Sequence, residues 1–591
     1  MEHKVIYHVA TDSLKDFEEC AGQVKELGGT HMMVGDLPRS RWMWERDLKD
    51  PYSNWSMGHA QLFKLVCPPQ LKQYLPQEHI AECMELVQAR CDILKRLGLR
   101  PALFSNEPFW LPEEVYRDHP QWRGARCDHP RRSTKPYYSP CIDHPEVLSM
   151  YRSSMRELVQ RTGIDFFNFM SNDSGGGVCW SGGTYVGPNG PSHCRHRMMA
   201  DRIAGFIDAL SEGAREGGTD AVIHFNANID FKAPEEQIGS VWPRLKENQI
   251  VNSLDCRGMR PITIIADLGA PKQPVKKIPR MVRYAGFLQQ ARQADTPIVV
   301  VDMPRSDFEE AFLCGRKALH RPLNSMADCL DLLRDTACEI AGSACGPKLL
   351  DAWYHIDESY KHLSHTGLDL IMYGCQHQRW INRPFLLFPL ELPEEEKEYY
   401  RKYQFQALTQ EDAADLMNLQ GIEGVRGFTS AFLITQTVFQ ARKSMDKAID
   451  LLQQILEDKE SRMDAEKLSL LIRRLKVQEC FYDNITNAVQ FQELADRTDF
   501  ETPPQLSLRW PTRDDRRIEE FQNITRAEID NVTLLADLLD GYEEQILLMT
   551  DEAHEDIFLY GPHFVEQLRK KAEIMWDHML DGNRVYVTHN I

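Results

Sequence analysis

The sequence predicts a (β/α)₈ barrel, also called a TIM barrel, followed by a mostly helical C-terminal domain. Three observations lead to this fold class. Apolar runs of strand length alternate with amphipathic helical stretches through the first part of the chain. The runs are continuously apolar, which is typical of parallel strands covered on both faces. Roughly eight strand–helix units fit before residue 345, where helical periodicity takes over. We therefore place a barrel domain at 1–345 and a helical domain at 346–591.

The expected elements follow one another from the start of the chain. Strands at 4–10 and 30–34 flank a helix at 13–27, and a helix at 78–97 leads into a third strand at 100–104. The remaining expected elements are helices at 145–161 and 195–216 and strands that begin at 164, 221, 249, 262 and 297. The spacing is irregular in two places. The runs at 249 and 262 are too close for a helix between them, and a ninth candidate strand lies at 368–373.

Helical periodicity dominates beyond residue 346. Apolar residues recur three and four positions apart, for example at Met445, Ala448, Leu452 and Ile455. This spacing predicts amphipathic helices packed into a bundle. We expect this half of the chain to serve as a scaffold, an interface in a homo-oligomer, or a wall of the functional site.

Charge and composition exclude several classes of partner. The 591 residues carry a net charge of −19, which argues against binding to nucleic acid or to an anionic membrane surface. The N-terminal sequence lacks the apolar stretch of a signal peptide, and no run of about 18 apolar residues occurs. Fifteen cysteines without paired spacing fit a reducing compartment. We expect a cytoplasmic protein, or one trimmed of its signal peptide, that needs no cofactor.

Polar residues fall at or just past the carboxyl ends of six predicted strands. They are Asp36, Glu107, Asp173, Asn226, Asp255 and Asp302. In parallel barrels these ends, together with the loops that follow them, build the active site. Any loop can begin with a polar residue, but six at one end of a barrel favour a shared polar cavity.

The loop after the fourth predicted strand is the most distinctive segment. The strand that begins at 164 ends abruptly at Asn172 and Asp173, and three glycines follow. The glycine- and proline-rich stretch beyond them cannot continue a strand or start a helix, so it predicts a long loop. Long loops often carry function. This one contains Trp180, Tyr185 and Asn189, which would line a polar, ring-shaped ligand.

Tryptophans are concentrated in the loops after the second, third and fourth predicted strands. Six of the 11 tryptophans lie there: Trp42, Trp44, Trp55, Trp110, Trp122 and Trp180. A flat indole ring with an N–H edge suits stacking on a sugar ring. The alternative is that long loops form small hydrophobic cores around their tryptophans.

Carboxylates that face aromatic rings at the mouth of a barrel favour cleavage of a glycosidic bond. This reaction needs one protonated carboxyl group near the leaving oxygen and a second group that stabilises the oxocarbenium-like state. Asp173 is the expected acid, because desolvation at the end of an apolar strand would raise its pKa. Its partner is left open, with Glu107 and Asp255 as the first candidates and Asp36 and Asp302 after them.

Further residues on the strand ends and loops are expected to bind the substrate. They are Asp36, Arg39, Asn106, Trp110, Asn172, Trp180, Tyr185, Asn189, His224, Asn226 and Asp302. Arg39 and other loop arginines either clamp an anionic substituent, such as a uronate carboxylate or a sulfate, or make ordinary ion pairs.

The end of the fourth strand resembles that of the barrel glycoside hydrolases. The residues that carry the resemblance are Asn172 and Asp173, followed by a glycine-rich loop with a tryptophan. The similarity is to the loose group of family 20 and family 84 β-N-acetylhexosaminidases and family 67 α-glucuronidases. In families 20 and 84 two acidic residues end strand four. The resemblance implies that Asn172 takes the position that orients the substrate and that Asp173 is the acid, although Asn172 lacks the charge of its counterpart.

The main interpretation is a glycoside hydrolase that removes terminal units from small oligosaccharides, because long loops tend to close a barrel mouth into a pocket. The sugar is left open among N-acetylhexosamines, uronic acids and other substituted sugars. Two alternatives remain. One is a metal-dependent sugar isomerase or lyase that uses loop residues Cys127, His129, Cys141, His144, His193, Cys194 and His196. The other is a barrel that binds carbohydrate without cleaving it.

Overall fold

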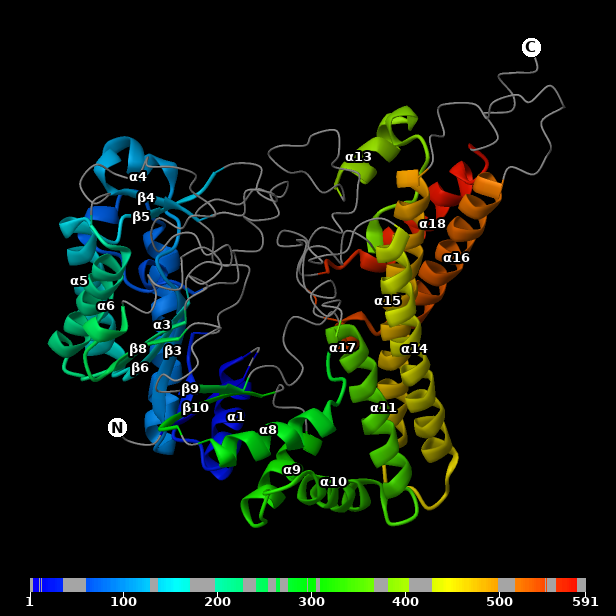
Figure 1. Cartoon of the computed structure of the whole chain (residues 1–591), viewed down its shortest axis with the longest axis horizontal. Coiled ribbons are helices and arrows are strands. Elements are labelled where there is room, and N and C mark those ends of the chain that lie inside the picture. Colours follow the sequence, from blue (N-terminus) through cyan, green and yellow to red (C-terminus); the bar gives the residue numbers. More distant parts are fainter. Residues whose placement is uncertain are drawn as a thin grey trace. The chain divides into compact units, whose positions relative to one another are not determined.

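A computed structural model gives the fold of the chain (Figure 1). It describes residues 4–9, 11, 13–35, 60–127, 136–170, 197–226, 241–252, 262–265, 275–294, 296–303, 309–365, 381–402, 428–497, 516–547, 549 and 560–581. The chain divides into two compact units. The first comprises Met1–Leu268, Phe287–Arg321 and Ala407–Thr409, and the second comprises Gly269–Gly286, Pro322–Gln406 and Gln410–Ile591.

Eight strands of the described residues form one parallel sheet in the first unit. They are β1 (Lys4–Val9), β2 (His31–Met33), β3 (Arg100–Asn106), β6 (Phe166–Met170), β7 (Val222–Asn226), β8 (Gln249–Asn252), β9 (Ile262–Ile265) and β10 (Ile298–Met303). Their order is β8-β7-β6-β3-β2-β1-β10-β9, and every neighbouring pair is parallel. Consecutive strands are neighbours and the first strand pairs with the last. This is the order of a (β/α)₈ barrel opened between its sixth and seventh strands, so the predicted fold class is confirmed.

The opening falls at the irregular spacing that the sequence revealed. The two runs that were too close for an intervening helix are β8 and β9, the two edges of the described sheet. The ninth candidate strand, at 368–373, lies outside the described residues.

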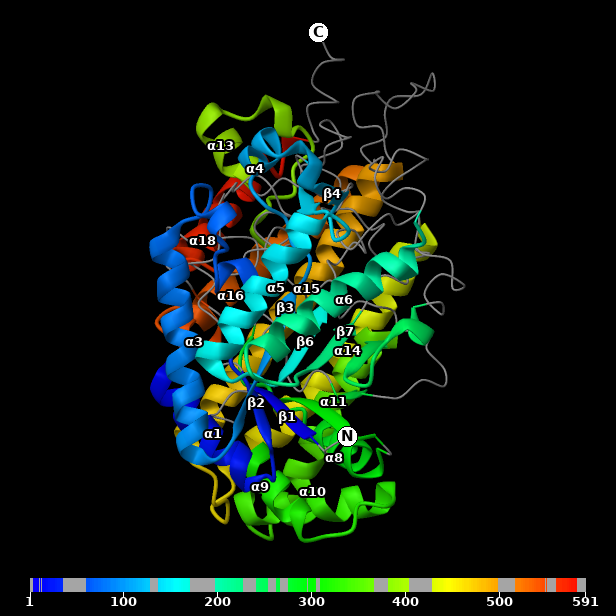
Figure 2. The ribbon, with the colours of Figure 1, turned by 90° about the vertical axis from the view of Figure 1, so that its left-hand side faces the viewer.

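Helices connect the strands. They include α1 (Leu14–Glu26), α3 (Gln77–Leu97), α5 (Pro145–Thr162), α6 (Met199–Glu216), α8 (Met281–Gln293) and α9 (Glu309–Leu319). Figure 2 shows α3, α5 and α6 on the outer side of the strands. Local sequence sets their ends. The side chain of Ser13 caps α1 by accepting from the backbone N–H of Asp16, and Gly98 ends α3 with a φ of 75°, which favours glycine.

A small hairpin stands between β3 and α5. It pairs β4 (Arg123–Arg126) with β5 (Tyr138–Pro140) in an antiparallel manner, and α4 (Glu113–Asp118) precedes it. The sequence predicted only a loop here. The strands are three and four residues long, too short to leave a periodic pattern.

Alternation along the strands separates a lumen face from an outer face. The lumen carries one apolar layer made of Ile6, Met33, Ala102, Phe166, Val222, Ile250, Ile298 and Val300. Side chains of the opposite parity point to the helices. Phe225 of β7, for example, meets Phe206 of α6 edge to face at a centroid distance of 6.3 Å. The middle of the lumen is therefore filled by apolar side chains, as is usual for a barrel of this class.

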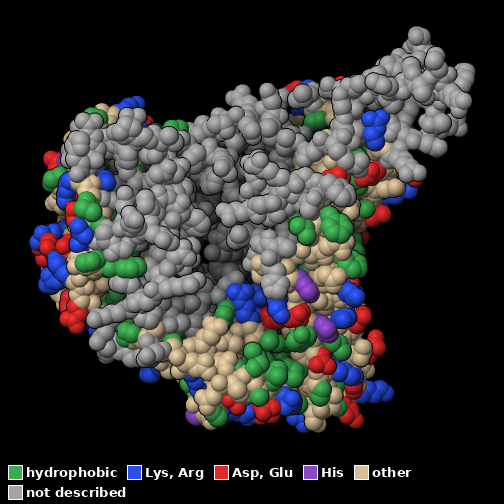
Figure 3. Space-filling model, in the orientation of Figure 1, with side chains coloured by type: hydrophobic (Ala, Val, Ile, Leu, Met, Phe, Trp, Pro, Cys, Tyr) green, Lys and Arg blue, Asp and Glu red, His purple; other side chains and the backbone are tan. Residues whose placement is uncertain are grey.

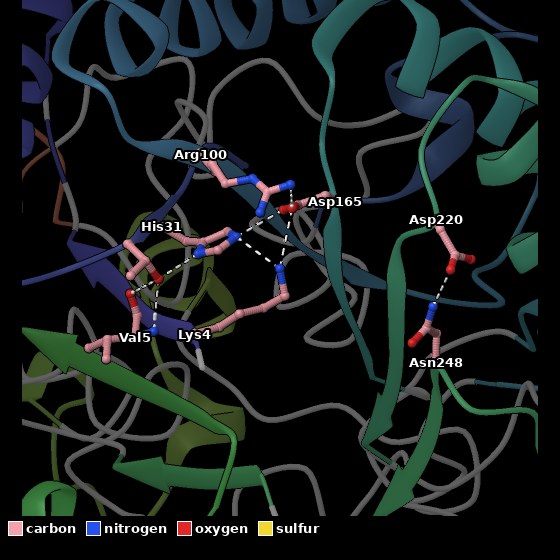
Figure 4. Close-up of polar contacts among 8 residues, drawn as sticks. Lys4, Val5, His31, Arg100, Asp165, Asp220 and Asn248 are labelled. Atoms are coloured by element: carbon pink, nitrogen blue, oxygen red, sulfur yellow. Dashed lines mark hydrogen bonds and ion pairs between the residues drawn. The ribbon is translucent and has the colours of Figure 1, made fainter. Parts of the chain in front are cut away.

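An ion cluster lies at the amino-terminal end of the lumen (Figure 4). The Asp165 carboxylate lies 3.2 Å from Lys4 Nζ, 2.9 Å from His31 Nε2 and 2.7 Å from an Arg100 guanidinium nitrogen. Lys4, His31 and Asp165 are buried. Burial acts to raise the pKa of Asp165, but the hydrogen bond with His31 and the nearby positive charges outweigh it, so the pKa is lowered. The described polar side chains of this cluster are thus paired with one another.

The second unit is helical. Its main helices are α10 (Met326–Ala341), α11 (Gly346–His365), α13 (Glu394–Lys402), α14 (Phe428–Glu457), α15 (Ala465–Arg497), α16 (Arg516–Leu539) and α18 (Phe564–His578). Helix α14 packs on α11 and α15, α15 on α16, and α16 on α18. The predicted apolar face of α14, Met445, Ala448, Leu452 and Ile455, is buried as expected.

The described surface is of mixed charge. Figure 3 shows Lys and Arg side chains interspersed with Asp and Glu on the described part of the face in view. Among the described residues, no helix combines the length and the apolar character needed to cross a membrane.

Candidate active site

Asn168 and His224 face the lumen above the apolar layer. Side chains alternate along a strand, so residues two positions beyond Phe166 and Val222 lie on the same face. These residues are Asn168 on β6 and His224 on β7, and the register of the two strands makes them direct neighbours. Each is the central residue of its five-residue strand and lies two positions from the apolar layer in the direction of the carboxyl end, where parallel barrels carry their active sites.

Asn106 shares this face at the end of β3. It is paired in register with Met170 of β6, which is paired in turn with Asn226 of β7, and Asn226 with Asn252 of β8. The fold therefore brings together three predicted substrate-binding positions, Asn106, His224 and Asn226, at one end of one lumen. Only the backbone of Asn226 and Asn252 belongs to the described structure.

Five buried side-chain atoms of this group have no hydrogen-bond partner. They are Nδ2 and Oδ1 of Asn106, Oδ1 of Asn168, and both ring nitrogens of His224. Asn106 and His224 have no exposed surface, whereas Asn168 keeps 6% of its surface accessible. Burial lowers the pKa of His224 to about 3, so its ring is neutral near pH 7. Folded chains normally pair their buried polar groups. These atoms are therefore set up for a ligand or for water.

Two further strands bring polar residues to the same end. The register of β1 and β10 places His8 beside Asp302. Both positions share the parity of Ile6 and Val300 in the apolar layer, so both belong to the lumen face. The backbone thus puts the predicted Asp302 at the carboxyl end of the lumen, and its side chain lies outside the described structure.

Glu107 lies on the other side of the β3 backbone. Its Oε1 accepts hydrogen bonds from the backbone N–H of Leu62 and from the Ser105 hydroxyl, the latter at 3.1 Å. Ser105 alternates with the lumen-facing Asn106 and so points outward. The Glu107 side chain is fully buried, and the Tyr151 hydroxyl of α5 adjoins it. The geometry does not bring this expected catalytic carboxyl to the lumen side chains.

The Glu107 carboxyl instead fastens the segment that starts at Ala60. The backbone N–H of Asn106 donates to the carbonyl of Ala60 at 2.8 Å, and the Ser105 hydroxyl donates to the same carbonyl at 3.2 Å. Together with the Leu62 bond, these contacts hold residues 60–62 against the end of β3. Glu107 is thus placed to fix the backbone from which Asn106 reaches the lumen.

Burial sets the protonation of Glu107 and of its neighbour Lys64. It raises the pKa of Glu107 to about 8, against hydrogen bonds from Leu62 and Ser105 that act in the opposite direction. It lowers the pKa of Lys64 to about 7. Both shifts favour uncharged forms, so Glu107 is largely protonated near pH 7.

The two described loop tryptophans form small cores. Trp110 is 2% exposed and packs with Phe109, Cys127 and Tyr137. Trp122 donates through Nε1 to Glu146 Oε2 at 2.7 Å and is stacked on a histidine ring. Covered rings cannot serve as platforms for a sugar. The alternative interpretation of the loop tryptophans therefore holds for these two, including the predicted substrate-binding Trp110.

Several predicted residues lie outside the described structure. They are Asp36, Arg39, Asn172, Asp173, Trp180, Tyr185, Asn189 and Asp255. Of the suggested metal ligands, Cys127, Cys141 and His144 are described. The described residues contain no group of three or more His, Cys, Asp or Glu placed to hold a metal ion.

Sequence reasoning missed Asn168. It is the only polar residue of β6, FFNFM, and stands two positions beyond a phenylalanine of the lumen layer. A polar residue inside an otherwise apolar strand was the available signal, because a buried amide needs a reason to be there.

Several solved structures that are similar to this chain are glycoside hydrolases. No family model and no curated protein matches the chain. A GH138 enzyme targeting pectin rhamnogalacturonan II matches 98% of this chain and 83% of that one, with a TM-score of 0.52 and 7% identity. At this identity the likeness shows the fold alone. It confirms the expected resemblance to barrel glycoside hydrolases for the fold, and the narrower resemblance to families 20, 84 and 67 stays a prediction.

Two other solved structures have lower scores. The O-GlcNAc hydrolase of Thermobaculum terrenum, as a variant, matches 98% of this chain and 96% of that one at 9% identity, with a TM-score of 0.33. A GH20 exo-β-N-acetylglucosaminidase from Vibrio harveyi matches 57% of each chain at 11% identity, with a TM-score of 0.30.

Proposed function

We propose that the chain is a glycoside hydrolase that removes terminal units from small oligosaccharides at the carboxyl end of its barrel. The observation that carries the proposal is the group of unpartnered polar side chains Asn106, Asn168 and His224 on the lumen face. Amides and a neutral imidazole both donate and accept hydrogen bonds, as sugar hydroxyls do. The fold shared with a glycoside hydrolase adds support.

Asp173 is the proposed general acid and Asp255 its proposed partner. Asp173 follows β6 by three residues and Asp255 follows β8 by three residues. Both therefore come shortly after the carboxyl ends of barrel strands in the sequence. Asp302, at the end of β10, is a further candidate carboxylate. Because Glu107 lies behind β3, we assign it a positioning role.

The remaining predicted residues would hold the substrate from the loops. Those after β6 are Asn172, Trp180, Tyr185 and Asn189, and those after β2 are Asp36 and Arg39. Loops at this end of a parallel barrel converge on one site, so residues far apart in the sequence would contact the same sugar.

The test is hydrolysis of aryl glycosides by the purified full-length chain. The panel contains N-acetylhexosaminides, hexuronides and neutral hexosides, each with a good leaving group (2,4-dinitrophenol) and a poor one (phenol). A general acid protonates the departing oxygen, and good leaving groups need little of this help. Asp173→Asn should therefore lower kcat/KM by about 100-fold or more for phenyl glycosides, and far less for dinitrophenyl glycosides.

The matched control is Asp220→Asn, which changes an exposed aspartate that accepts from the Asn248 side chain at 2.7 Å (Figure 4). It should leave both substrates unaffected. Equal losses for both leaving groups in Asp173→Asn would remove Asp173 from the acid role. Saturable sugar binding without turnover of any glycoside would replace the proposal with a non-catalytic carbohydrate-binding barrel.

A further inference from the structure

Building on the proposed function, we infer that Asn106, Asn168 and His224 form a lumen subsite for a neutral, hydroxyl-bearing sugar ring. The subsite would discriminate against a ring that carries a carboxylate or sulfate at this position. The inference narrows the substrate class that the sequence left open between neutral and anionic sugars. It rests on three features: the missing hydrogen bonds of these side chains, the absence of charge among the described lumen side chains of β3, β6 and β7 above the apolar layer, and the contrast with the opposite end of the lumen.

The atoms without hydrogen-bond partners include both donors and acceptors. Asn106 presents a free donor and a free acceptor, Asn168 a free acceptor, and the neutral His224 ring one donor and one acceptor. A hydroxyl group both donates and accepts, so vicinal ring hydroxyls can satisfy these atoms together. A carboxylate or sulfate only accepts, and it would leave the amide oxygens and the imidazole lone pair facing negative charge.

The described lumen side chains above the apolar layer carry no charge on β3, β6 and β7. They are Phe104, Asn106, Asn168, Met170 and His224. An anionic group buried here would meet no described cation on these strands, and burying an unpaired charge is costly. Met170 and Phe104 offer apolar surface, which suits the C–H faces of a sugar ring.

At the opposite end of the same lumen, buried polar groups that only stabilise the fold are paired with one another. Asp165 is surrounded there by Lys4, His31 and Arg100, with each contact within hydrogen-bonding distance. The side chains of this cluster leave no buried polar atom without a partner, in contrast to Asn106, Asn168 and His224. Unpaired buried groups cost stability, and a ligand that binds them recovers that free energy.

Of the three residues, Asn168 alone keeps accessible surface. Asn106 and His224 have none, so a ring that reaches them must displace the groups that cover them. A buried water molecule is the competing occupant, since water also donates and accepts. The experiment separates water from sugar.

The first arm uses the wild-type full-length chain and needs no variant. Matched pairs of p-nitrophenyl hexosides and hexuronides of the same configuration, which differ only at C6, are compared by kcat/KM. Binding of the corresponding methyl glycosides is compared by calorimetry. We expect the neutral member of the preferred pair to be favoured at least tenfold in both measurements. A preference for the hexuronide would overturn the inference and leave the glycosidase proposal standing.

The second arm uses Asn168→Leu and His224→Leu, which remove polar atoms while keeping apolar volume. Sites that hydrogen-bond a substrate hydroxyl lose much affinity when the bond is removed. Each variant should raise KM and the methyl glycoside Kd about tenfold or more, without lowering Tm. Asn248→Leu, at the amino-terminal end of β8, is the control and should leave Kd unchanged.

The outcomes separate the two proposals. If Asn168→Leu shifts Tm but not Kd, the free atoms are satisfied by buried water and the subsite is refuted. If no glycoside is hydrolysed but neutral methyl glycosides bind and Asn168→Leu weakens them, the hydrolase proposal fails and the subsite stands. Weaker binding by the variants, together with a preference for neutral glycosides in turnover, supports both proposals.

Discussion

Lys571 and Glu528 form an ion pair between α18 and α16 in which neither side chain is exposed. The carboxylate also accepts from Asn484 Nδ2 at 2.6 Å and from Asn487 Nδ2 at 2.9 Å, both on α15. Lys571 Nζ donates to the Ile381 carbonyl at 2.9 Å. One buried carboxylate thus links three helices of the second unit. A buried pair of this kind is stable only as a unit, because removing one partner leaves the other charge uncompensated.

This pair gives the first prediction. Lys571→Met and Glu528→Gln should each lower the free energy of unfolding by about 3–5 kcal/mol. The double variant should lose much less than the sum, because neither charge is then left alone. Urea denaturation of the four proteins measures the coupling. The control is Lys570→Met, whose exposed pair with Glu573 should matter by less than about 0.5 kcal/mol. Additive losses would show that the two charges act independently.

The second prediction concerns the ion cluster at the amino-terminal end of the barrel. Asp165→Asn leaves Lys4 and His31 buried without their carboxylate and should cost about 3 kcal/mol or more. Because the pKa of Asp165 is lowered in the fold, its contribution is present above the unfolded value and is lost as the pH falls through the lowered one.

Asp165→Asn should therefore lower the free energy of unfolding and also weaken its dependence on pH at acidic pH. Unfolding by urea between pH 3 and pH 7 tests both effects. The control is Asp220→Asn, an exposed carboxylate near the same end (Figure 4), which should change stability by less than about 0.5 kcal/mol. An equal loss at all pH values would mean that Asp165 acts through packing and not through its charge.

The barrel could be predicted from the sequence because the patterns that indicate its strands and helices are local. Each continuous apolar run within the described residues gave one strand, and residues such as Ser13 and Gly98 set helix ends within their own turns. The position of Asn168 was also readable in principle, since it is the one polar residue of β6 and shares a face with Phe166, two positions earlier.

What the sequence could not supply depends on contacts between distant segments. Asp165 contacts Lys4, which lies 161 positions earlier in the chain, and no local sequence pattern predicts this pairing. Glu107 follows a lumen residue directly, yet its side chain turns to the backbone of Leu62 on the outer side, a partner 45 residues away. From the sequence alone, Trp110 fits a stacking platform for a sugar as well as a core residue. The structure decides between the two by placing Tyr137 beside it.

The third prediction concerns the charge of His224. Burial lowers its pKa to about 3, so the ring should stay neutral throughout the range in which ordinary histidines titrate. Between pH 6.5 and about 3 the unfolded chain binds a proton that the folded chain does not, so stability falls as the pH falls through this range. Nitrogen-15 NMR of the His224 ring should show no titration above pH 4. A ring that titrates near pH 6.5 would contradict the neutral lumen.

The last prediction separates a positioning Glu107 from a catalytic one. Burial raises the pKa of Glu107 to about 8, so the group is largely protonated near pH 7 and glutamine copies its shape and neutrality. Glu107→Gln should keep the Oε1 bonds from Leu62 and Ser105, and at pH 7 it should preserve kcat. Glu107→Ala leaves both donors without an acceptor and opens a cavity, so it should cost about 2–4 kcal/mol.

The pH dependence gives the same test a second readout. The folded pKa of Glu107 lies above its ordinary value of 4.5, so the folded chain keeps a proton that the unfolded chain releases, and stability falls as the pH rises from about 4.5 to about 8. Glu107→Gln should remove this decrease of the free energy of unfolding with rising pH, as measured by urea denaturation. Lys64, whose pKa burial lowers to about 7, should make stability rise above that pH in both proteins. If Glu107→Gln keeps its stability but loses turnover by orders of magnitude, Glu107 takes part in the chemistry, and the carboxyl behind β3 must reach the substrate by a rearrangement of β3 and the 60–62 segment.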